Sequence, residues 1–266
     1  MVNLIATTVN YGVPPADGVR AFQTINQDLV SGKRERNFTY HTQDVQVENI
    51  RGKEDTVSLD TAGFQFYAIP AKYKGEFLDD EEVKREYYPE NEELLKKLTG
   101  ASRVVIFDHS EYIEVVHSHY TLYIICSIQS LAIRRHKPGQ NDSSPKKRQP
   151  VQQAHVDQTT SASIARVHRH LPPDEAPALL KRRFQIINLW RPISVSALEW
   201  PLALCDFRSV DADNDLFPVA LIFPDREGET LSVKHNPNHK WKYVRNMTPD
   251  DIVLIKWCVD LAAYLG

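Results

Sequence analysis

The second half of the chain contains a succession of short β-branched or aromatic runs separated by turn residues, and this pattern restricts the fold more than any other feature. Each run has about the length of one strand and is shorter than most helices. Many short strands spaced by turns are typical of a β-sandwich or jelly roll. We therefore expect a mainly β fold. The runs are at 184–190, 217–223, 230–234, 240–244 and 252–257.

The first half of the chain adds further strands and several helices at the periphery. A charged stretch at 79–98 predicts a helix that breaks at Pro89 and is closed by Gly100. Asp79 or Asp80 is its expected N-cap. Further strands are expected at 45–50, 56–59, 64–69, 103–107 and 151–157, and two short helices at 161–182.

Composition limits the partners of this chain. With 266 residues, of which 42% are hydrophobic, it can bury one sizeable core, and we expect a single domain spanning 1–266. A net charge of -3 offers no electrostatic attraction to nucleic acid or to an anionic membrane, and it leaves small neutral or anionic ligands open as partners. The three cysteines lie far apart, and the first residues do not resemble a secretory signal, which together favour the cytosol.

His155 and Asp157 form the motif with the clearest chemistry, at the end of an expected strand. Residues two apart in a strand point to the same face, so an imidazole nitrogen and a carboxylate oxygen can reach one ion. These are two of the three ligands of a 2-His-1-carboxylate iron site, which leaves positions open for a 2-oxo acid and O2. On the order of 0.7 such triplets are expected by chance in this chain, so a His-Asp hydrogen bond at a strand end is the alternative.

The sequence around this motif resembles one family. Gln-Pro-Val-Gln-Gln-Ala-His-Val-Asp-Gln-Thr at 149–159 and Gln-Ile-Ile-Asn-Leu-Trp-Arg-Pro-Ile at 185–193 are similar to the fungal hydroxylase/desaturase family that contains gibberellin desaturase and the aspergillic-acid hydroxylase. Other similar blocks follow the same order along the chain. They are at 58–64, 87–90, 100–104, 166–172, 201–206, 209–210, 226–230, 236–241 and 247–250.

The resemblance implies a double-stranded β-helix, Fe(II), 2-oxoglutarate as cosubstrate, and hydroxylation or desaturation of a small molecule in fungal secondary metabolism. His155 and Asp157 match the metal ligands of the family motif. Arg191 lies on an expected strand that can face the pocket, where its guanidinium could pair with a carboxylate of the cosubstrate. A structural or surface arginine is the alternative at this position.

The chain departs from the family pattern in two places. Residues 111–132 have no counterpart, so we expect an insertion there, followed by an exposed basic loop up to 150. The family also continues into a block with a second histidine ligand and a late arginine, which has no match here, so we expect the last strands to be missing. His239, or His235, is then the candidate third ligand. The alternative function is a catalytically inactive truncated relative or a non-enzymatic jelly-roll binding protein.

Overall fold

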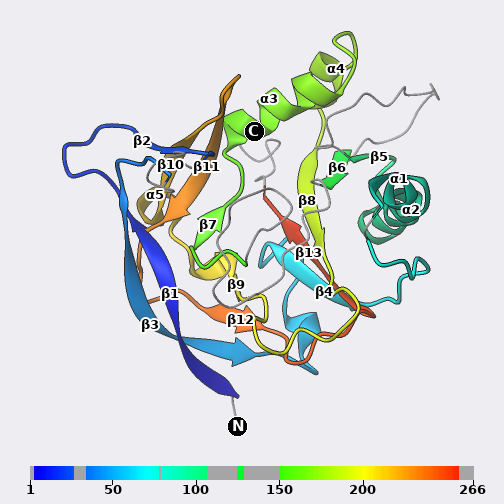
Figure 1. The fold of residues 1–266 in the computed structure, drawn as a ribbon, viewed down its shortest axis with the longest axis horizontal. Coiled ribbons are helices and arrows are strands. Elements are labelled where there is room, and N and C mark those ends of the chain that lie inside the picture. Colours follow the sequence, from blue (N-terminus) through cyan, green and yellow to red (C-terminus); the bar gives the residue numbers. More distant parts are fainter. Residues whose placement is uncertain (1–2, 27–33, 78, 107–124, 129–149, 258–266) are drawn as a thin grey trace. The chain divides into compact units, whose positions relative to one another are not determined.

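The computed structural model describes residues 3–26, 34–77, 79–106, 125–128 and 150–257 (Figure 1). The expected insertion at 111–132 and the basic loop therefore lie outside the described residues, apart from 125–128 and Pro150. Contacts divide the chain into two compact units, each made of three separate segments. The first unit comprises 1–65, 132–162 and 197–246, and the second comprises 66–131, 163–196 and 247–266. A single domain spanning 1–266 stays a prediction.

The first unit contains two four-stranded sheets. In one the strand order is β1-β3-β12-β9, and in the other it is β2-β10-β11-β7. The ten residues of β1 pair antiparallel with β3 along their whole length. The strands are β1 (Leu4–Val13), β2 (Ala21–Thr24), β3 (Thr39–Asn49), β7 (His155–Val156), β9 (Leu204–Cys205), β10 (Leu216–Ile222), β11 (Glu227–Val233) and β12 (Trp241–Tyr243).

The main core of this unit joins residues from both sheets. Tyr11, Val47 and Trp241 come from the first sheet and pack with Val233 of the second. The two sheets approach so closely that a Cβ on Gly12 of β1 would lie 2.1 Å from Ser232 Oγ of β11. Any other residue at this position would require the side chains of Ser232 and Phe217 to shift.

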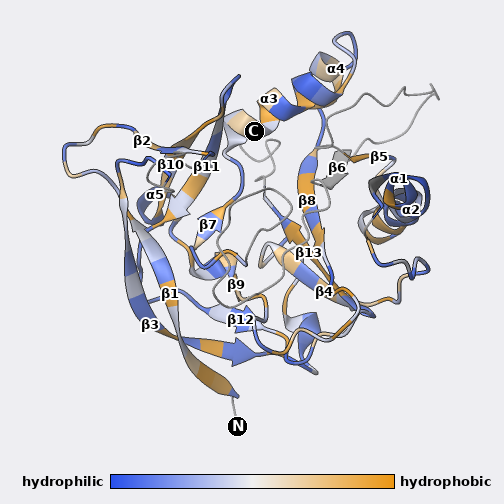
Figure 2. Cartoon of the chain, in the orientation of Figure 1, coloured by the Kyte–Doolittle hydropathy of each residue, from blue (hydrophilic) through white to orange (hydrophobic). Residues whose placement is uncertain are grey.

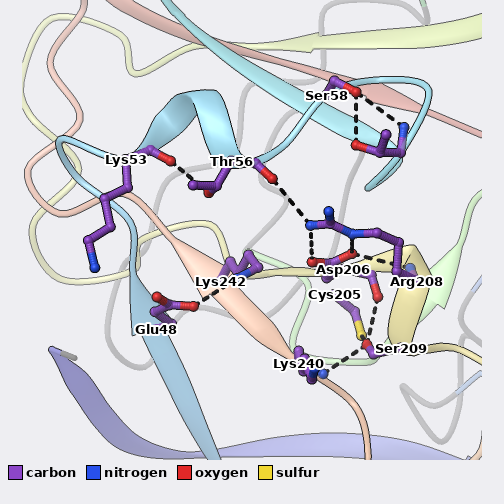
Figure 3. A network of polar contacts seen from close by, with 11 residues as sticks. Glu48, Lys53, Thr56, Ser58, Cys205, Asp206, Arg208, Ser209, Lys240 and Lys242 are labelled. Atoms are coloured by element: carbon purple, nitrogen blue, oxygen red, sulfur yellow. Dashed lines mark hydrogen bonds and ion pairs between the residues drawn. The ribbon is translucent and has the colours of Figure 1, made fainter.

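A buried carboxylate organises the segment that follows β9, as Figure 3 shows. Arg208 Nη2 donates to Asp206 Oδ2 over 2.6 Å and to the carbonyl of Thr56 over 3.3 Å. Ser209 Oγ donates to the Asp206 carbonyl and accepts from the backbone N–H of Lys240. Burial alone would raise the pKa of Asp206, but the hydrogen bonds from Arg208 outweigh it and the pKa is lowered. Asp206 is therefore a charged residue that holds the loop, with a side chain only 5% exposed.

The second unit is built on a five-stranded sheet of order β4-β13-β8-β6-β5. β13 and β8 are antiparallel, whereas β5, β6 and β8 run parallel to one another. Ile125–Ile128, which falls within the expected insertion, forms the strand between β5 and β8. The strands are β4 (Phe64–Ala68), β5 (Arg103–Ile106), β6 (Ile125–Ile128), β8 (Gln185–Trp190) and β13 (Asp251–Lys256).

The acidic helix of the second unit continues through the expected break at Pro89. α1 (Asp80–Glu82) leads into a π-helical segment, Val83–Tyr87, and then into α2 (Tyr88–Thr99). Proline is tolerated because it occupies the first turn of α2, directly after the wider π-helical turns. The helix end was predicted correctly, since Gly100 has a φ of 70° and caps the last turn. Hydrophilic residues dominate α2 (Figure 2).

Two further helices of the chain confirm the sequence expectation for 161–182. α3 (Thr160–His170) and α4 (Ala176–Leu180) are separated by the Pro172-Pro173 segment. Val167, Leu179 and Phe184 form a buried cluster in the second unit. A further short helix, α5 (Ala212–Asp215), belongs to the first unit. No helix in the described residues is long and apolar enough to cross a membrane.

The mainly β architecture is confirmed, and the differences from the sequence expectations are local. β1 and β2 were not predicted, and in place of the strand expected at 56–59 the chain has the end of a 3-10 helix at Thr56 and a turn that begins at Leu59. The strand expected at 151–157 is reduced to His155–Val156, with one isolated bridge from Gln153 to Asn10. The polar residues before His155 extend the chain without forming a longer ladder.

Candidate functional site

His155 and Asp157 lie together at the end of β7, as their spacing predicted. His155 Nε2 is 3.0 Å from Asp157 Oδ1, and each side chain is about one-third exposed, at 36% and 34%. The other ring nitrogen, Nδ1, lies 2.7 Å from the backbone carbonyl of Gln153. A carbonyl can only accept, so Nδ1 carries the proton in this contact and Nε2 faces the carboxylate. The pair thus presents one nitrogen and one oxygen side by side.

β7 is held on both sides by strands of the first unit. It pairs antiparallel with β11, with His155 opposite Ser232 and Val156 opposite Leu231. The backbone N–H of Ala154 donates to the carbonyl of Asn10 in β1 over 2.9 Å. Two residues of β7 are therefore enough to fix the backbone, because the neighbouring strands supply the hydrogen bonds that a longer ladder would provide.

The geometry of this pair fits a divalent cation of the iron type. In an octahedral site with metal–ligand bonds of about 2.1 Å, two adjacent ligand atoms lie about 3.0 Å apart. His155 Nε2 and Asp157 Oδ1 are separated by that distance. Metal-bound histidines almost always donate their second N–H to a carboxylate, a backbone carbonyl or water, as His155 does to Gln153. The residues therefore fit two adjacent positions of a 2-His-1-carboxylate centre.

The structure places His239 in a different cluster of the first unit. Its side chain is 1% exposed, and Nε2 lies 2.9 Å from Asp215 Oδ2. The ring stacks on Tyr11, whose hydroxyl lies 3.4 Å from Nδ1 and accepts from Trp241 Nε1 over 2.7 Å. Both ring nitrogens thus face protein partners. In the described part of the chain, no third His, Cys, Asp or Glu joins His155 and Asp157 in a metal-binding group.

The side chain of Arg191, in the second unit, joins two separate backbone segments. Its Nη1 donates to the carbonyl of Ile69 over 3.0 Å and to that of Pro249 over 2.8 Å. These contacts tie the segment after β4 to the segment before β13. Arg191 Nε and Nη2 are buried without a hydrogen-bond acceptor among the described residues. Its binding of a 2-oxoglutarate carboxylate stays a prediction.

Sequence reasoning did not single out Glu229, Thr159 and Ser161, which form a polar cluster at the segment that follows Asp157. Glu229 Oε1 accepts hydrogen bonds from Thr159 Oγ1 at 2.8 Å and from Ser161 Oγ at 3.0 Å. Both hydroxyls follow Asp157 closely in the chain. The Arg-Glu-Gly-Glu-Thr block at 226–230 and the Gln-Thr after Asp157 carried the family resemblance, and this was the only signal of their importance.

Comparisons with known proteins agree with the geometry. A family profile described as an oxidoreductase/YMDC permease-like domain matches residues 9–263. The hydroxylase/desaturase efuI of Hormonema carpetanum is 35% identical over 95% of this chain and 82% of its own length. The hydroxylase/desaturase CTB9 of Cercospora beticola is 34% identical over 93% of this chain and 73% of its own. The chain belongs to the fungal hydroxylase/desaturase family.

A third relative is named as an iron-dependent enzyme, and a solved structure gives the fold. The Fe(II)/2-oxoglutarate-dependent dioxygenase nvfI of Aspergillus novofumigatus is 27% identical over 85% of this chain and 73% of its own. The solved structure of the iron and α-ketoglutarate-dependent endoperoxidase NvfI superimposes with a TM-score of 0.72 and 22% identity, over 96% of this chain and 84% of that one. The expected double-stranded β-helix (jelly roll) is thereby confirmed.

Proposed function

We propose that this chain is a non-haem Fe(II), 2-oxoglutarate-dependent oxygenase that hydroxylates or desaturates a small molecule of fungal secondary metabolism. The observation that carries the proposal is the His155 Nε2–Asp157 Oδ1 separation of 3.0 Å in a motif shared with the family. Relatives named as Fe(II)/2-oxoglutarate-dependent and α-ketoglutarate-dependent dioxygenases support both the metal and the cosubstrate. We further propose a cytosolic location. The described residues contain no helix that could span a membrane, which agrees with this proposal.

His155 and Asp157 would hold the iron. Bound iron would activate O2 for reaction with a 2-oxo acid. Oxidation of an unactivated C–H bond requires this activation. The backbone carbonyl of Gln153 accepts a hydrogen bond from the Nδ1–H of His155. This contact keeps the imidazole in the tautomer whose Nε2 lone pair is available. Asp157 contributes the negative charge that offsets part of the charge of a divalent cation. The proposal does not use His239, since both of its ring nitrogens face Tyr11 and Asp215.

Binding of 2-oxoglutarate to the metal tests the proposal without knowledge of the substrate. Fe(II) and then 2-oxoglutarate are added anaerobically to the purified chain, and the visible charge-transfer band of a chelated 2-oxo acid is recorded. We expect a band in the wild type and none in His155→Ala or Asp157→Ala. His41→Ala, which removes an exposed histidine from β3, is the matched control and should retain the band.

The result that would overturn the proposal is a folded wild-type protein without the band, or a band that persists in His155→Ala. Either would favour a non-catalytic relative that keeps the fold. For Arg191, the same titration provides a test of the predicted cosubstrate contact. If its guanidinium pairs with a carboxylate, Arg191→Lys should weaken 2-oxoglutarate binding, because lysine cannot form the bidentate contact.

A further inference from the structure

We propose that Glu229 is a positioning residue for the metal pair, which acts through the hydroxyl groups of Thr159 and Ser161 to fix the backbone that carries Asp157. This inference rests on the proposed metal site. Glu229 itself does not reach the metal ligands in any contact that the structure shows. Its role is to hold the connection between β7 and α3, where Asp157 lies.

Three polar side chains form a closed set of hydrogen bonds at this connection. Thr159 Oγ1 donates to Glu229 Oε1, lies 2.9 Å from Ser161 Oγ, and accepts from the backbone N–H of Ala162 over 3.1 Å. Thr159 therefore acts as the N-cap of α3, with only 7% of its surface exposed. Because its single proton goes to Glu229, the carboxylate determines how the cap is oriented.

The carboxylate of Glu229 is held from the opposite side by Arg20. Arg20 Nη2 lies 2.8 Å from Glu229 Oε2, and the Glu229 side chain is 21% exposed. Burial alone would raise the pKa of Glu229, but the contacts with Arg20, Thr159 and Ser161 outweigh it and the pKa is lowered. The positive end of the α3 dipole favours the same ionised form. Glu229 thus remains charged and anchored while it accepts hydrogen bonds from both hydroxyl groups.

The next residue of the same strand holds the backbone between the two proposed ligands. Thr230 Oγ1 donates to the carbonyl of Val156 over 2.5 Å. β11 therefore fixes the chain before Asp157 through Thr230 and after it through Glu229. A metal site needs its ligand atoms within about 0.5 Å of the productive geometry, and anchors on both sides of Asp157 favour this precision.

The test separates metal affinity from fold stability. Co(II) is the probe, and its dissociation constant is measured from the Co(II) absorption bands at one fixed pH, while the melting temperature is measured without metal. We expect Glu229→Ala to weaken Co(II) binding by up to about 10-fold, the low end of the loss for a direct partner of a ligand, because Glu229 acts one contact further away. Glu227→Gln is the matched control. Glu227 lies on the same strand and also pairs with Arg20, at 2.6 Å, but within the described residues it makes no hydrogen bond to either hydroxyl, so we expect less than about a twofold change.

A second pair of variants keeps the inference testable if Glu229→Ala does not fold. Thr159→Val removes the hydroxyl and should weaken Co(II) binding in the same way, whereas Thr159→Ser keeps it and should bind close to wild type. Tyr11→Phe removes the acceptor of Trp241 Nε1–H but keeps the ring that packs in the cluster with Ala154, so we expect it to lower stability and leave the affinity unchanged. Loss of affinity in Tyr11→Phe would mean that Co(II) binding only follows stability, and would overturn the inference.

The outcomes for the site and for its positioning differ. If the wild type does not bind Co(II), or if His155→Ala binds it as well as the wild type does, the proposed metal site fails. If the wild type binds through His155 while folded Glu229→Ala or Thr159→Val binds equally tightly, the site stands and the positioning role is refuted.

Discussion

Replacing His239 by alanine should destabilise the fold and leave metal binding intact. Replacing His155 by alanine should abolish metal binding and change the stability little. Both histidines were candidate ligands from the sequence. The structure separates them, because the His239 side chain is 1% exposed and paired with buried Asp215, while the His155 side chain is 36% exposed beside Asp157. The pair of variants therefore tests the assignment of each histidine.

The magnitude for His239→Ala follows from its contacts. The variant loses a hydrogen bond of 2.9 Å to the Asp215 carboxylate, and bonds to charged groups contribute about 1.5–3 kcal/mol. It also removes a buried ring that stacks on Tyr11 with a centroid distance of 5.7 Å. Asp215 keeps hydrogen bonds from Asn236 and from the backbone of Asp211, which limits the penalty. We expect a loss of about 3 kcal/mol in the free energy of unfolding, and less than about 1 kcal/mol for His155→Ala.

Urea unfolding followed by fluorescence gives the stability, and a Co(II) titration of the same preparations gives the affinity. The reasoning would be refuted by a His239→Ala protein that unfolds at the wild-type urea concentration. A folded His239→Ala protein that has lost Co(II) binding would show that His239 is a ligand after all. In that case the Asp215 contact would have to open when the metal binds.

Three further predictions follow from buried polar groups. Tyr11→Phe leaves the buried Trp241 Nε1–H without its acceptor and should cost about 1–3 kcal/mol in urea unfolding, with part of the loss recovered in Tyr11→Phe/Trp241→Phe; additive losses would contradict this. The pKa of Asp206 in the folded protein is below its usual 3.8. The ionised carboxylate therefore stabilises the fold above about pH 4, and this stabilisation is lost as the pH falls through the folded pKa. Asp206→Asn should remove this part of the acid dependence of unfolding. Burial raises the pKa of the Cys205 thiol to about 11. With the other two cysteines replaced by serine, the folded protein should therefore react with a thiol reagent at pH 8 far more slowly than the urea-unfolded protein does. Equal rates would show that the thiol is accessible.

The sequence by itself determined the fold class and predicted the contact between His155 and Asp157. Strands such as β8, β10 and β13 are visible because each is a short run of apolar and β-branched residues bounded by turn residues, which is a local pattern. His155 and Asp157 were visible for the same reason, since residues two apart on an extended chain share a face.

Tertiary structure alone decided what the other candidate residues do. His239 is a buried partner of Asp215 because residues 24 positions apart meet, and no local spacing encodes that contact. β1 carries few buried residues, so its pattern was weak, and only its antiparallel pairing with β3 establishes it as a strand. Glu229 meets Thr159 across 70 positions of the chain. Contacts over such separations depend on which strands become neighbours, and strand order is a property of the folded sheets that the sequence pattern of single strands does not contain.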